Sequence, residues 1–429
     1  MSQIIFGCVA DDFTGASDAA SFLVKGGFKT ILINGVPDHD LNVEGDCDAA
    51  VIALKTRTQE TSQAVEDTLH AVKWLRQRGA HQIFLKYCST FDSTKHGNIG
   101  PIVDKILEEY DVHYTILCPA LPVNERIVKD GRLYVDGLPL DESHMKNHPL
   151  TPMWDSDIAN LMKPQGKYAC FKVNSEMMKK TKQEILHAID EFGKDKRHFY
   201  VIPDFIYDKD AEKIVNVFGD LPVLTGGSGL MEEIGKKYHA KRHPETNSVL
   251  SGTGGPALVL AGSCSKATLA QIAYFQKSGA KSIQLIPSEI HDPHRIDEIW
   301  NFILENKENR ILVYSSGSET NIEEERKNAK KWWENASLLE NMTAEIADRA
   351  VHAGFTRIIV AGGETSGAVT KKLGFNSFFI GESIAPGVPI MIPTDHKNIR
   401  LILKSGNFGQ KDFFNRSLDM TENKESEKL

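Results

Sequence analysis

Two rhythms of hydrophobic residues alternate along the first half of the chain. Short apolar runs rich in β-branched and aromatic residues are typical of buried strands, whereas apolar residues three and four positions apart indicate helices. The strand candidates are residues 4–10, 30–34, 49–54, 82–87, 114–119 and 198–203, and the helix candidates between them are 15–25, 61–78 and 99–109. This β-then-α order predicts a mainly parallel sheet covered by helices on both faces.

The rhythm stops between residues 240 and 256, where polar and turn-forming residues indicate a linker. It then restarts, with strand candidates at 257–261, 282–286, 310–314, 356–361 and 389–392 and helix candidates at 266–277 and 344–353. We therefore predict an α/β fold of two domains with mainly parallel sheets, residues 1–240 and 256–420. Ligands of α/β proteins bind at the carboxyl ends of the strands, so the loops leaving them should carry the active site, in a cleft between the domains.

Composition and charge narrow the class of protein. At 429 residues the chain exceeds what one hydrophobic core usually supports. The formal net charge of −8 disfavours nucleic-acid binding, which depends on clustered Lys and Arg, but permits a local basic pocket for a small anion. No apolar run approaches a membrane span, no signal peptide is visible, and the six cysteines form no CxxC pair. These features predict a cytoplasmic protein without a membrane or nucleic-acid partner.

Asp11 and Asp12 directly follow the first predicted strand. Two adjacent carboxylates at the carboxyl end of a strand are costly unless something binds them. Either one could accept a hydrogen bond from a substrate hydroxyl, remove its proton, or help to hold Mg²⁺. The simpler alternative is that one of them caps the following helix. Capping accounts for one carboxylate but not for two, so the pair favours a functional role.

Basic residues follow two further strands. Lys55 and Arg57 come after the strand at 49–54, and Lys86 opens a stretch with several hydroxyls, Lys-Tyr-Cys-Ser-Thr-Phe-Asp-Ser-Thr (86–94). Taken singly, each would more often be a solvated surface charge, but their shared position after successive strands places them on the rim that carries the aspartates. Because Arg can grip a carboxylate bidentately, Arg57 and Lys86 are predicted to bind the carboxylate of an acidic substrate.

Two other segments carry weaker signals. His144 and His148 stand at i and i+4 within residues 131–152, but without an acidic third ligand nearby a metal site is not predicted, and the segment is interpreted as a loop that could act as a lid. The Gly-rich turn at 225–230 precedes a helix and could hold an anion on its backbone N–H groups. Tight packing explains this turn equally well.

Three glycine-containing loops follow strands of the second half, at residues 260–268, 360–368 and 404–409. Glycines let the backbone approach a phosphate closely, and a helix N-terminus supplies partial positive charge. None of the loops is a Walker A motif or a GxGxxG fingerprint, and the missing fingerprint disfavours a nicotinamide-dependent enzyme. The loops therefore predict phosphate binding in the second domain.

Taken together, these segments resemble the four-carbon acid sugar kinase family, and they are most similar to its 3-oxo-tetronate kinase branch. The resemblance runs in the family's order from about residue 4 to residue 409 and is more specific than any single motif. It is carried by Ala-Asp-Asp-Phe-Thr-Gly-Ala-Ser-Asp (10–18), the stretch 86–94, Pro-Ala-Leu-Pro-Val-Asn (119–124), Met-Lys-Asn-His-Pro-Leu-Thr-Pro-Met (145–153) and Ala-Gly-Gly-Glu-Thr-Ser-Gly (361–367).

The resemblance implies an N-terminal sugar-binding domain, a C-terminal nucleotide-binding domain, and ATP-dependent phosphorylation of the terminal (4-) hydroxyl of a 3-oxo-tetronate. It implies substrate contacts at Asp11, Asp12, Arg57, Lys86, Ser89, Thr90 and Asp92. It implies nucleotide contacts at Ser263 or Ser265, at Gly362, Gly363, Glu364 and Thr365, and at Gly406. The expected partners are the sugar acid and ATP, and a homo-oligomer is left open.

The expected chemistry is in-line transfer of the γ-phosphoryl group, in which positioning and charge neutralisation do most of the catalysis. Mg²⁺ would bridge the phosphates, and Asp12 would orient or deprotonate the attacking hydroxyl, with Asp92 as the alternative base. The alternatives are a kinase for threonate or erythronate, an NAD-dependent hydroxy-acid dehydrogenase, and a non-catalytic protein that binds sugar acids. The missing dinucleotide fingerprint argues against the dehydrogenase, and the second set of glycine loops argues against the binding protein.

Overall fold

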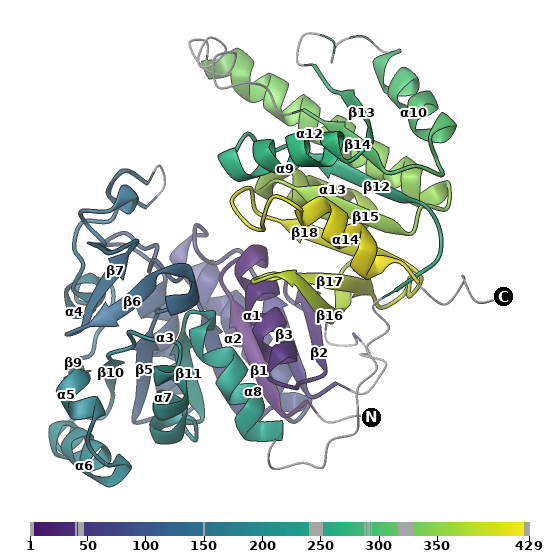
Figure 1. Cartoon of the computed structure of the whole chain (residues 1–429). Helices are drawn as coiled ribbons and strands as arrows, with labels where there is room; N and C mark the ends of the chain where they lie inside the picture. The colour runs from purple at the N-terminus through teal and green to yellow at the C-terminus, as the bar shows by residue number, and fades with distance from the viewer. Residues whose placement is uncertain are drawn as a thin grey trace. The chain divides into compact units, whose positions relative to one another are not determined.

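The computed structural model describes residues 4–38, 41, 47–148, 151–239, 252–286, 289, 292, 294–315 and 329–423. The chain divides into two compact units, Met1–Asn247 and Ser248–Leu429. Each unit is an α/β domain built on a mainly parallel sheet (Figure 1), so the predicted fold class is confirmed. Most of the linker predicted at 240–256 lies outside the described residues. The domain limits 1–240 and 256–420 stay a prediction.

The sheet of the first unit has the strand order β2–β3–β1–β4–β11–β5–β10–β9, and its neighbouring strands run parallel. Parallel strands with both faces covered are continuous apolar runs, and most residues of these strands are indeed buried. The bounds are β1 Phe6–Ala10, β2 Thr30–Asn34, β3 Ala49–Ala53, β4 Gln82–Lys86, β5 Tyr114–Cys118, β9 Cys170–Val173, β10 Phe199–Pro203 and β11 Val223–Gly226.

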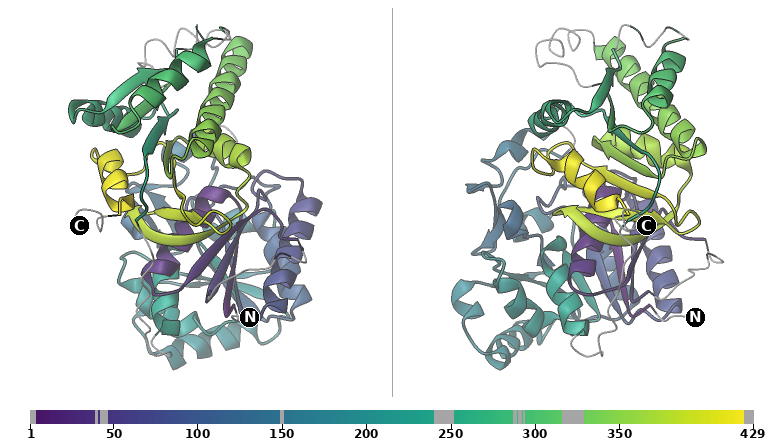
Figure 2. Two further views of the ribbon diagram at one scale, coloured as in Figure 1. Left: turned by 90° about the vertical axis from the view of Figure 1, so that its right-hand side faces the viewer. Right: turned by 45° about the vertical axis from the view of Figure 1, so that its right-hand side comes forward.

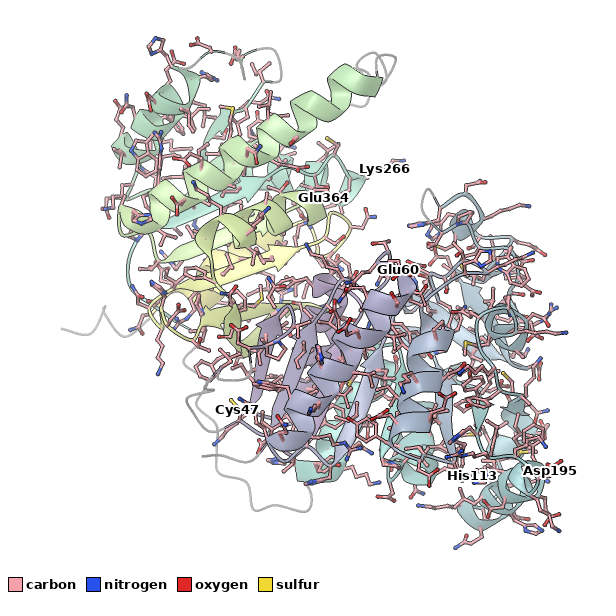
Figure 3. The ribbon with its side chains drawn as sticks, turned by 180° about the vertical axis from the view of Figure 1, so that it is seen from behind. Cys47, Glu60, His113, Asp195, Lys266 and Glu364 are labelled. Atoms are coloured by element: carbon pink, nitrogen blue, oxygen red, sulfur yellow. The ribbon has the colours of Figure 1, made fainter. Side chains whose placement is uncertain are left out.

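Helices cover both faces of this sheet. Figure 1 shows α1 (Phe13–Lys25), α7 (Asp210–Phe218) and α8 (Met231–His239) on one face, and α2 (Thr61–Gln77) and α3 (Ile99–Glu109) on the other. Figure 3 shows the second face from behind, where α2 begins next to the labelled Glu60. The remaining helical segments are η1 Pro122–Asn124, η2 His144–Asn147, α4 Ile158–Met162, α5 Ser175–Met178, α6 Lys182–Gly193 and η3 Ser228–Leu230.

The segment 131–152, interpreted from the sequence as a loop, is only partly irregular. It contributes β7 (Arg132–Val135) and β8 (Leu138–Pro139), which form a three-stranded antiparallel sheet with β6 (Arg126–Lys129). Leu133 and Val135 are fully buried while Arg132 is exposed, an alternation too short to stand out among the surrounding polar residues.

The second unit has the strand order β13–β14–β12–β15–β18–β17–β16, in which β17 runs antiparallel to both neighbours. Figure 2 shows α9 and α14 on one face and α12 and α13 on the other. The bounds are β12 Ala257–Ala261, α9 Lys266–Lys277, β13 Lys281–Gln284, α10 Arg295–Glu305, β14 Ile311–Tyr314, α12 Ala329–His352, β15 Arg357–Ala361, α13 Gly363–Leu373, β16 Ser377–Ala385, β17 Val388–Pro393, β18 Arg400–Lys404 and α14 Phe413–Thr421. Within the described ranges, no helix has the length and apolar character needed to cross a bilayer.

The strand register aligns the carboxyl ends of the central strands in each unit. In the first unit Ala10 pairs with both Ala53 and Lys86. In the second unit Ala361 pairs with both Ala261 and Lys404. The loops that carry the sequence-predicted site residues therefore leave their strands at one edge of each sheet.

Candidate functional site

Arg57 is the centre of a charged cluster at the carboxyl ends of β1, β3 and β4. Its Nε and Nη2 donate to the two oxygens of Asp11 at 2.8 and 2.9 Å. Its Nη1 lies 3.0 Å from Asp12 Oδ2 and 3.8 Å from Asp92 Oδ2. The bidentate face of this guanidinium is therefore occupied by a carboxylate of the protein itself. Substrate binding by Arg57 stays a prediction, with Nη1 as the atom best placed for it.

Asp12 has two roles in the local structure. Its Oδ1 accepts the Gly15 N–H at 2.6 Å and so caps α1, as the simpler alternative required. Its side chain is also the most exposed of the three carboxylates around Arg57, at 34% against 12% for Asp11 and 6% for Asp92. Burial, and after it the charge of Asp11, raises the pKa of Asp12 although Arg57 acts in the opposite direction. Capping and availability to a ligand are thus compatible.

Lys86, the last residue of β4, is 5% exposed. Its Nζ donates to the Tyr87 carbonyl at 2.8 Å. A methyl group placed on Gly15 would lie 3.1 Å from this Nζ and 2.6 Å from Asp12 Oδ1. The ammonium and the Asp12 carboxylate therefore both abut the first turn of α1, and glycine at this position leaves room for both.

The loop after β4 makes a tight turn that holds Asp92. Phe91 is fully buried with φ of 52°, a left-handed conformation that is unusual for a bulky residue and is often found at functional sites. Thr90 Oγ1 donates to Asp92 Oδ1 at 2.6 Å, and Cys88 Sγ lies 2.8 Å from the same hydroxyl. Burial raises the pKa of Cys88 to about 11, so this thiol is not a nucleophile at neutral pH. Ser89 is half-buried in the turn.

A pocket opens beside this cluster and brings together four residues predicted from the sequence: Asp11, Arg57, Lys86 and Asp92. Its remaining lining includes the polar Thr56 and Asn98 and apolar residues such as Val9, Leu85 and Ile102. Lys55, which was expected to converge on the same rim, is exposed and does not line the pocket.

Asn98 is a site residue that the sequence reasoning missed. It stands at the N-cap position of α3, but its side chain makes no capping hydrogen bond. Its amide instead donates to the carbonyls of Thr56 and Gln59, at 2.7 and 2.8 Å, and its oxygen accepts from Thr61 Oγ1 at 2.8 Å. Asn98 thereby fixes the loop that carries Arg57. An Asn directly before an apolar helical run was the available signal, but it reads as a cap.

The Gly-rich turn at 225–230 is explained by packing. A methyl group on Gly226, Gly227 or Gly229 would lie 2.2 to 2.4 Å from the carbonyl oxygens of Cys118, Pro119 and Ala120, respectively. Ser228 in this turn donates to Asp18 Oδ2 on α1, whereas Asp18 Oδ1 is buried without a hydrogen-bond partner.

In the second unit, the loops after β12 and β18 are joined at the Gly406 carbonyl. It accepts from Ser265 Oγ at 2.6 Å and from Thr268 Oγ1 at 2.9 Å. Ser263 Oγ accepts the Ser265 N–H at 3.2 Å, and a methyl group on Gly406 would lie 2.3 Å from that oxygen. The predicted nucleotide contacts Ser263, Ser265 and Gly406 are therefore neighbours.

The loop after β15 combines a constrained glycine with an open one. Gly362 has φ of 133°, and a methyl group on it would lie 2.9 Å from the Thr365 hydroxyl. Gly363 opens α13, and apart from its own chain neighbours and the backbone of its helix no described protein atom lies within 4 Å of the position that its Cβ would take. In Figure 3, Glu364 in the first turn of α13 and Lys266 in the first turn of α9 lie at the same edge of this unit. An anion could approach the backbone of Gly363 without displacing protein atoms.

Comparison with known proteins matches each of the two units to a described domain. A model described as a sugar-binding N-terminal domain matches residues 6–234, and one described as a nucleotide-binding C-terminal domain matches residues 258–414. The 3-oxo-tetronate kinase of Brucella melitensis is 38% identical over 415 residues, which cover 95% of this chain and 94% of that protein. The chain belongs to the four-carbon acid sugar kinase family.

Other relatives agree with this assignment. The 3-oxo-tetronate kinase of Pectobacterium atrosepticum is 38% identical and covers 97% of this kinase and 99% of its own length. The crystal structure of Haemophilus influenzae protein HI1011 has a TM-score of 0.85 and 37% identity, covering 96% of this kinase and 99% of that chain. Because its relatives over nearly the whole length are kinases, this protein is a phosphotransferase.

Proposed function

We propose that this kinase transfers the γ-phosphoryl group of ATP to the terminal (4-) hydroxyl of a four-carbon sugar acid, 3-oxo-tetronate. The names of its relatives support the substrate class. The observation that carries the proposal is the partly exposed Asp12 carboxylate, 3.0 Å from Arg57 Nη1, in the unit that matches a sugar-binding domain. A partly exposed carboxylate with a raised pKa is suited to accept the proton of an attacking hydroxyl.

The charge of the cluster constrains how an acid substrate would bind. Asp11, Asp12 and Asp92 carry three negative charges when ionised, and Arg57 and Lys86 carry two positive ones. The cluster as a whole therefore carries no net positive charge, so the substrate carboxylate needs a single basic group that is not paired with the aspartates, and the hydroxyl end of the substrate is the better partner for Asp12. We assign the substrate carboxylate to Lys86, which donates one of its three hydrogens to Tyr87, with Ser89 and Arg57 Nη1 as further contacts.

The alternative base, Asp92, is less accessible. Its carboxylate is 6% exposed and accepts from Thr90 at 2.6 Å. In this proposal Asp92, held by Thr90, is part of the pocket wall, while Asp11 fixes the guanidinium of Arg57. Asp12 orients the hydroxyl and removes its proton as the bond to phosphorus forms.

The second unit is proposed to bind ATP through Ser263 or Ser265, Gly406, and the segment from Gly362 to Thr365. The open space above Gly363 supports a close approach of phosphate to the backbone. Among the described residues, no group of three or more His, Cys, Asp or Glu side chains is arranged to hold a metal ion. Mg²⁺ is assigned to the phosphates, whose charge it would neutralise.

The test is to incubate the enzyme with Mg-ATP and single four-carbon acids while ADP release is followed. The panel contains 3-oxo-tetronate, threonate and erythronate, and a reaction without acid serves as the control. The proposal requires 3-oxo-tetronate to give the highest kcat/KM and a product phosphorylated at C4, as located by phosphorus NMR. A higher value for threonate or erythronate would replace the substrate, and ADP release that no acid stimulates would reject the substrate class.

A further inference from the structure

Lys404 is a buried lysine that the mechanism above does not use. It ends β18 and is 1% exposed. Its Nζ donates to three oxygens, the Gly406 carbonyl at 2.9 Å, Thr268 Oγ1 at 3.0 Å and the Ser405 carbonyl at 3.1 Å. An ammonium has three donor hydrogens, so its hydrogen-bonding capacity is filled by the two loops that carry predicted nucleotide contacts.

No negative charge in the described part of the chain compensates this ammonium. Its nearest ring is Phe413 of α14, whose centroid lies 5.7 Å from Nζ. The buried residues of α9, α13 and α14, the helices around this strand, include no ionisable side chain. A buried positive charge without a counter-ion is costly, and burial lowers the pKa of Lys404 to about 8.

A residue that only joined the loops after β12 and β18 would not need a positive charge. The Gly406 carbonyl already accepts hydrogen bonds from Ser265 and Thr268, so the two loops are tied together without Lys404. A buried charge without a counter-ion costs stability, so an apolar residue of similar volume at this position would remove that cost. The retained charge points instead to an anion that is absent from the free protein and arrives at these loops.

We propose that Lys404 is a positioning residue of the nucleotide site, and that the phosphates of the bound nucleotide supply the negative charge that compensates its ammonium. It acts through the loop: from its hydrogen bond with the Gly406 carbonyl it adds positive potential where the N-termini of α9 and α13 already favour an anion. Lys404 itself does not touch the nucleotide. This inference rests on the proposed placement of the nucleotide in the second unit.

The test uses the full-length protein and isothermal calorimetry with ADP. Lys404→Met should weaken ADP binding at least tenfold while the Tm of the nucleotide-free protein stays equal or rises. Lys404→Arg should recover part of the affinity. Lys277→Met removes an exposed lysine from the last turn of α9 and should change neither quantity.

The number of protons that the protein takes up when ADP binds distinguishes this role from a merely structural one. At a pH near 8 the Lys404 amine is about half protonated. A bound anion favours the charged form, so the wild-type protein should take up as much as about half a proton per ADP. The uptake is obtained by repeating the titration in buffers of different ionisation enthalpy, and it should vanish in Lys404→Met.

Three results would overturn the inference. One is wild-type ADP affinity in a folded Lys404→Met protein. Another is the absence of proton uptake in the wild-type protein, a measurement that needs no variant to fold. A wild-type protein that binds no ADP at all would instead refute the proposed nucleotide site, and with it the role of Lys404.

Discussion

Replacing Arg57 with Met tests whether its guanidinium is mainly the partner of the aspartates or a free ligand for substrate. Met keeps most of the side-chain length but leaves Asp11 and Asp12 without the hydrogen bonds and ion pair of Arg57. Removing one partner of a buried ion pair costs about 3–5 kcal/mol. Because the Arg57 side chain is 21% exposed, solvent screening reduces the expected cost to about 2–3 kcal/mol. For a unit of this size that corresponds to a fall in Tm of about 5–10 °C.

The assay is thermal unfolding followed by circular dichroism at neutral pH. The matched control is Arg197→Met, because Arg197 pairs with Asp111 at 3.5 Å with both side chains more than three-quarters exposed, and its Tm should stay nearly unchanged. The double variant Asp11→Asn with Arg57→Met should recover part of the loss, since the carboxylate with the two hydrogen bonds to Arg57 is then gone, although Asp12 remains.

The role that the sequence predicted for Arg57, a ligand of the substrate carboxylate, leads to a different expected result. A free substrate ligand would lose its charge with little change in Tm, while the KM for the sugar acid would rise more than tenfold and the KM for ATP would not. An Arg57→Met protein with the wild-type Tm would therefore refute the pairing argument. An unchanged Tm together with the raised KM would return Arg57 to the role of carboxylate ligand.

Three further predictions follow from the site. Asp12→Asn should lower kcat about 100-fold or more and leave binding of the acid largely intact. In the wild-type enzyme, kcat should fall as pH falls through the raised pKa of Asp12. Near-normal turnover of the variant would shift the role of the base to Asp92. Gly363→Ala should keep the wild-type Tm but weaken ADP binding in calorimetry, whereas Gly362→Ala should lower Tm because φ is 133°. Burial raises the pKa of Asp18 above its ordinary value of 3.8, so the folded state binds this proton more tightly than the unfolded state. The contribution of Asp18 to the unfolding free energy, measured by urea titrations, should therefore grow as pH falls through the raised pKa toward 3.8 and disappear as pH rises above it. Asp18→Asn should flatten this dependence, and an equally steep dependence in the variant would contradict it.

Much of the fold could be predicted because the central strands are continuous apolar runs. The ranges 30–34 and 257–261 match β2 and β12 residue for residue. β18 escaped detection because its apolar centre is flanked by Arg400 and Lys404, which a hydropathy pattern assigns to solvent although they are 3% and 1% exposed. Charges buried by hydrogen bonds to distant loops leave no periodic signal.

The sequence predicted which residues of the candidate site lie at the same edge of the sheet, but not which of them form ion pairs or hydrogen bonds with each other. Asp11 and Arg57 were placed at the same edge because each follows a strand. The sequence could not show that they satisfy each other, since their contact spans 46 positions and depends on which strands are neighbours. The same limit applies to Asn98 and Thr56, which meet only after α3 and the loop beyond β3 are packed together.

The position of β11 in the first sheet has a consequence for how the protein is made. β11 fills the place between β4 and β5, yet it leaves the ribosome roughly 100 residues after β5, a delay of about 5–20 s at ordinary rates of synthesis. During that interval the facing edges of β4 and β5 have no partner, and unpaired edges recruit other strands. A nascent chain of this protein should therefore need protection until residue 226 has emerged, and any fragment that ends before β11 should aggregate rather than fold.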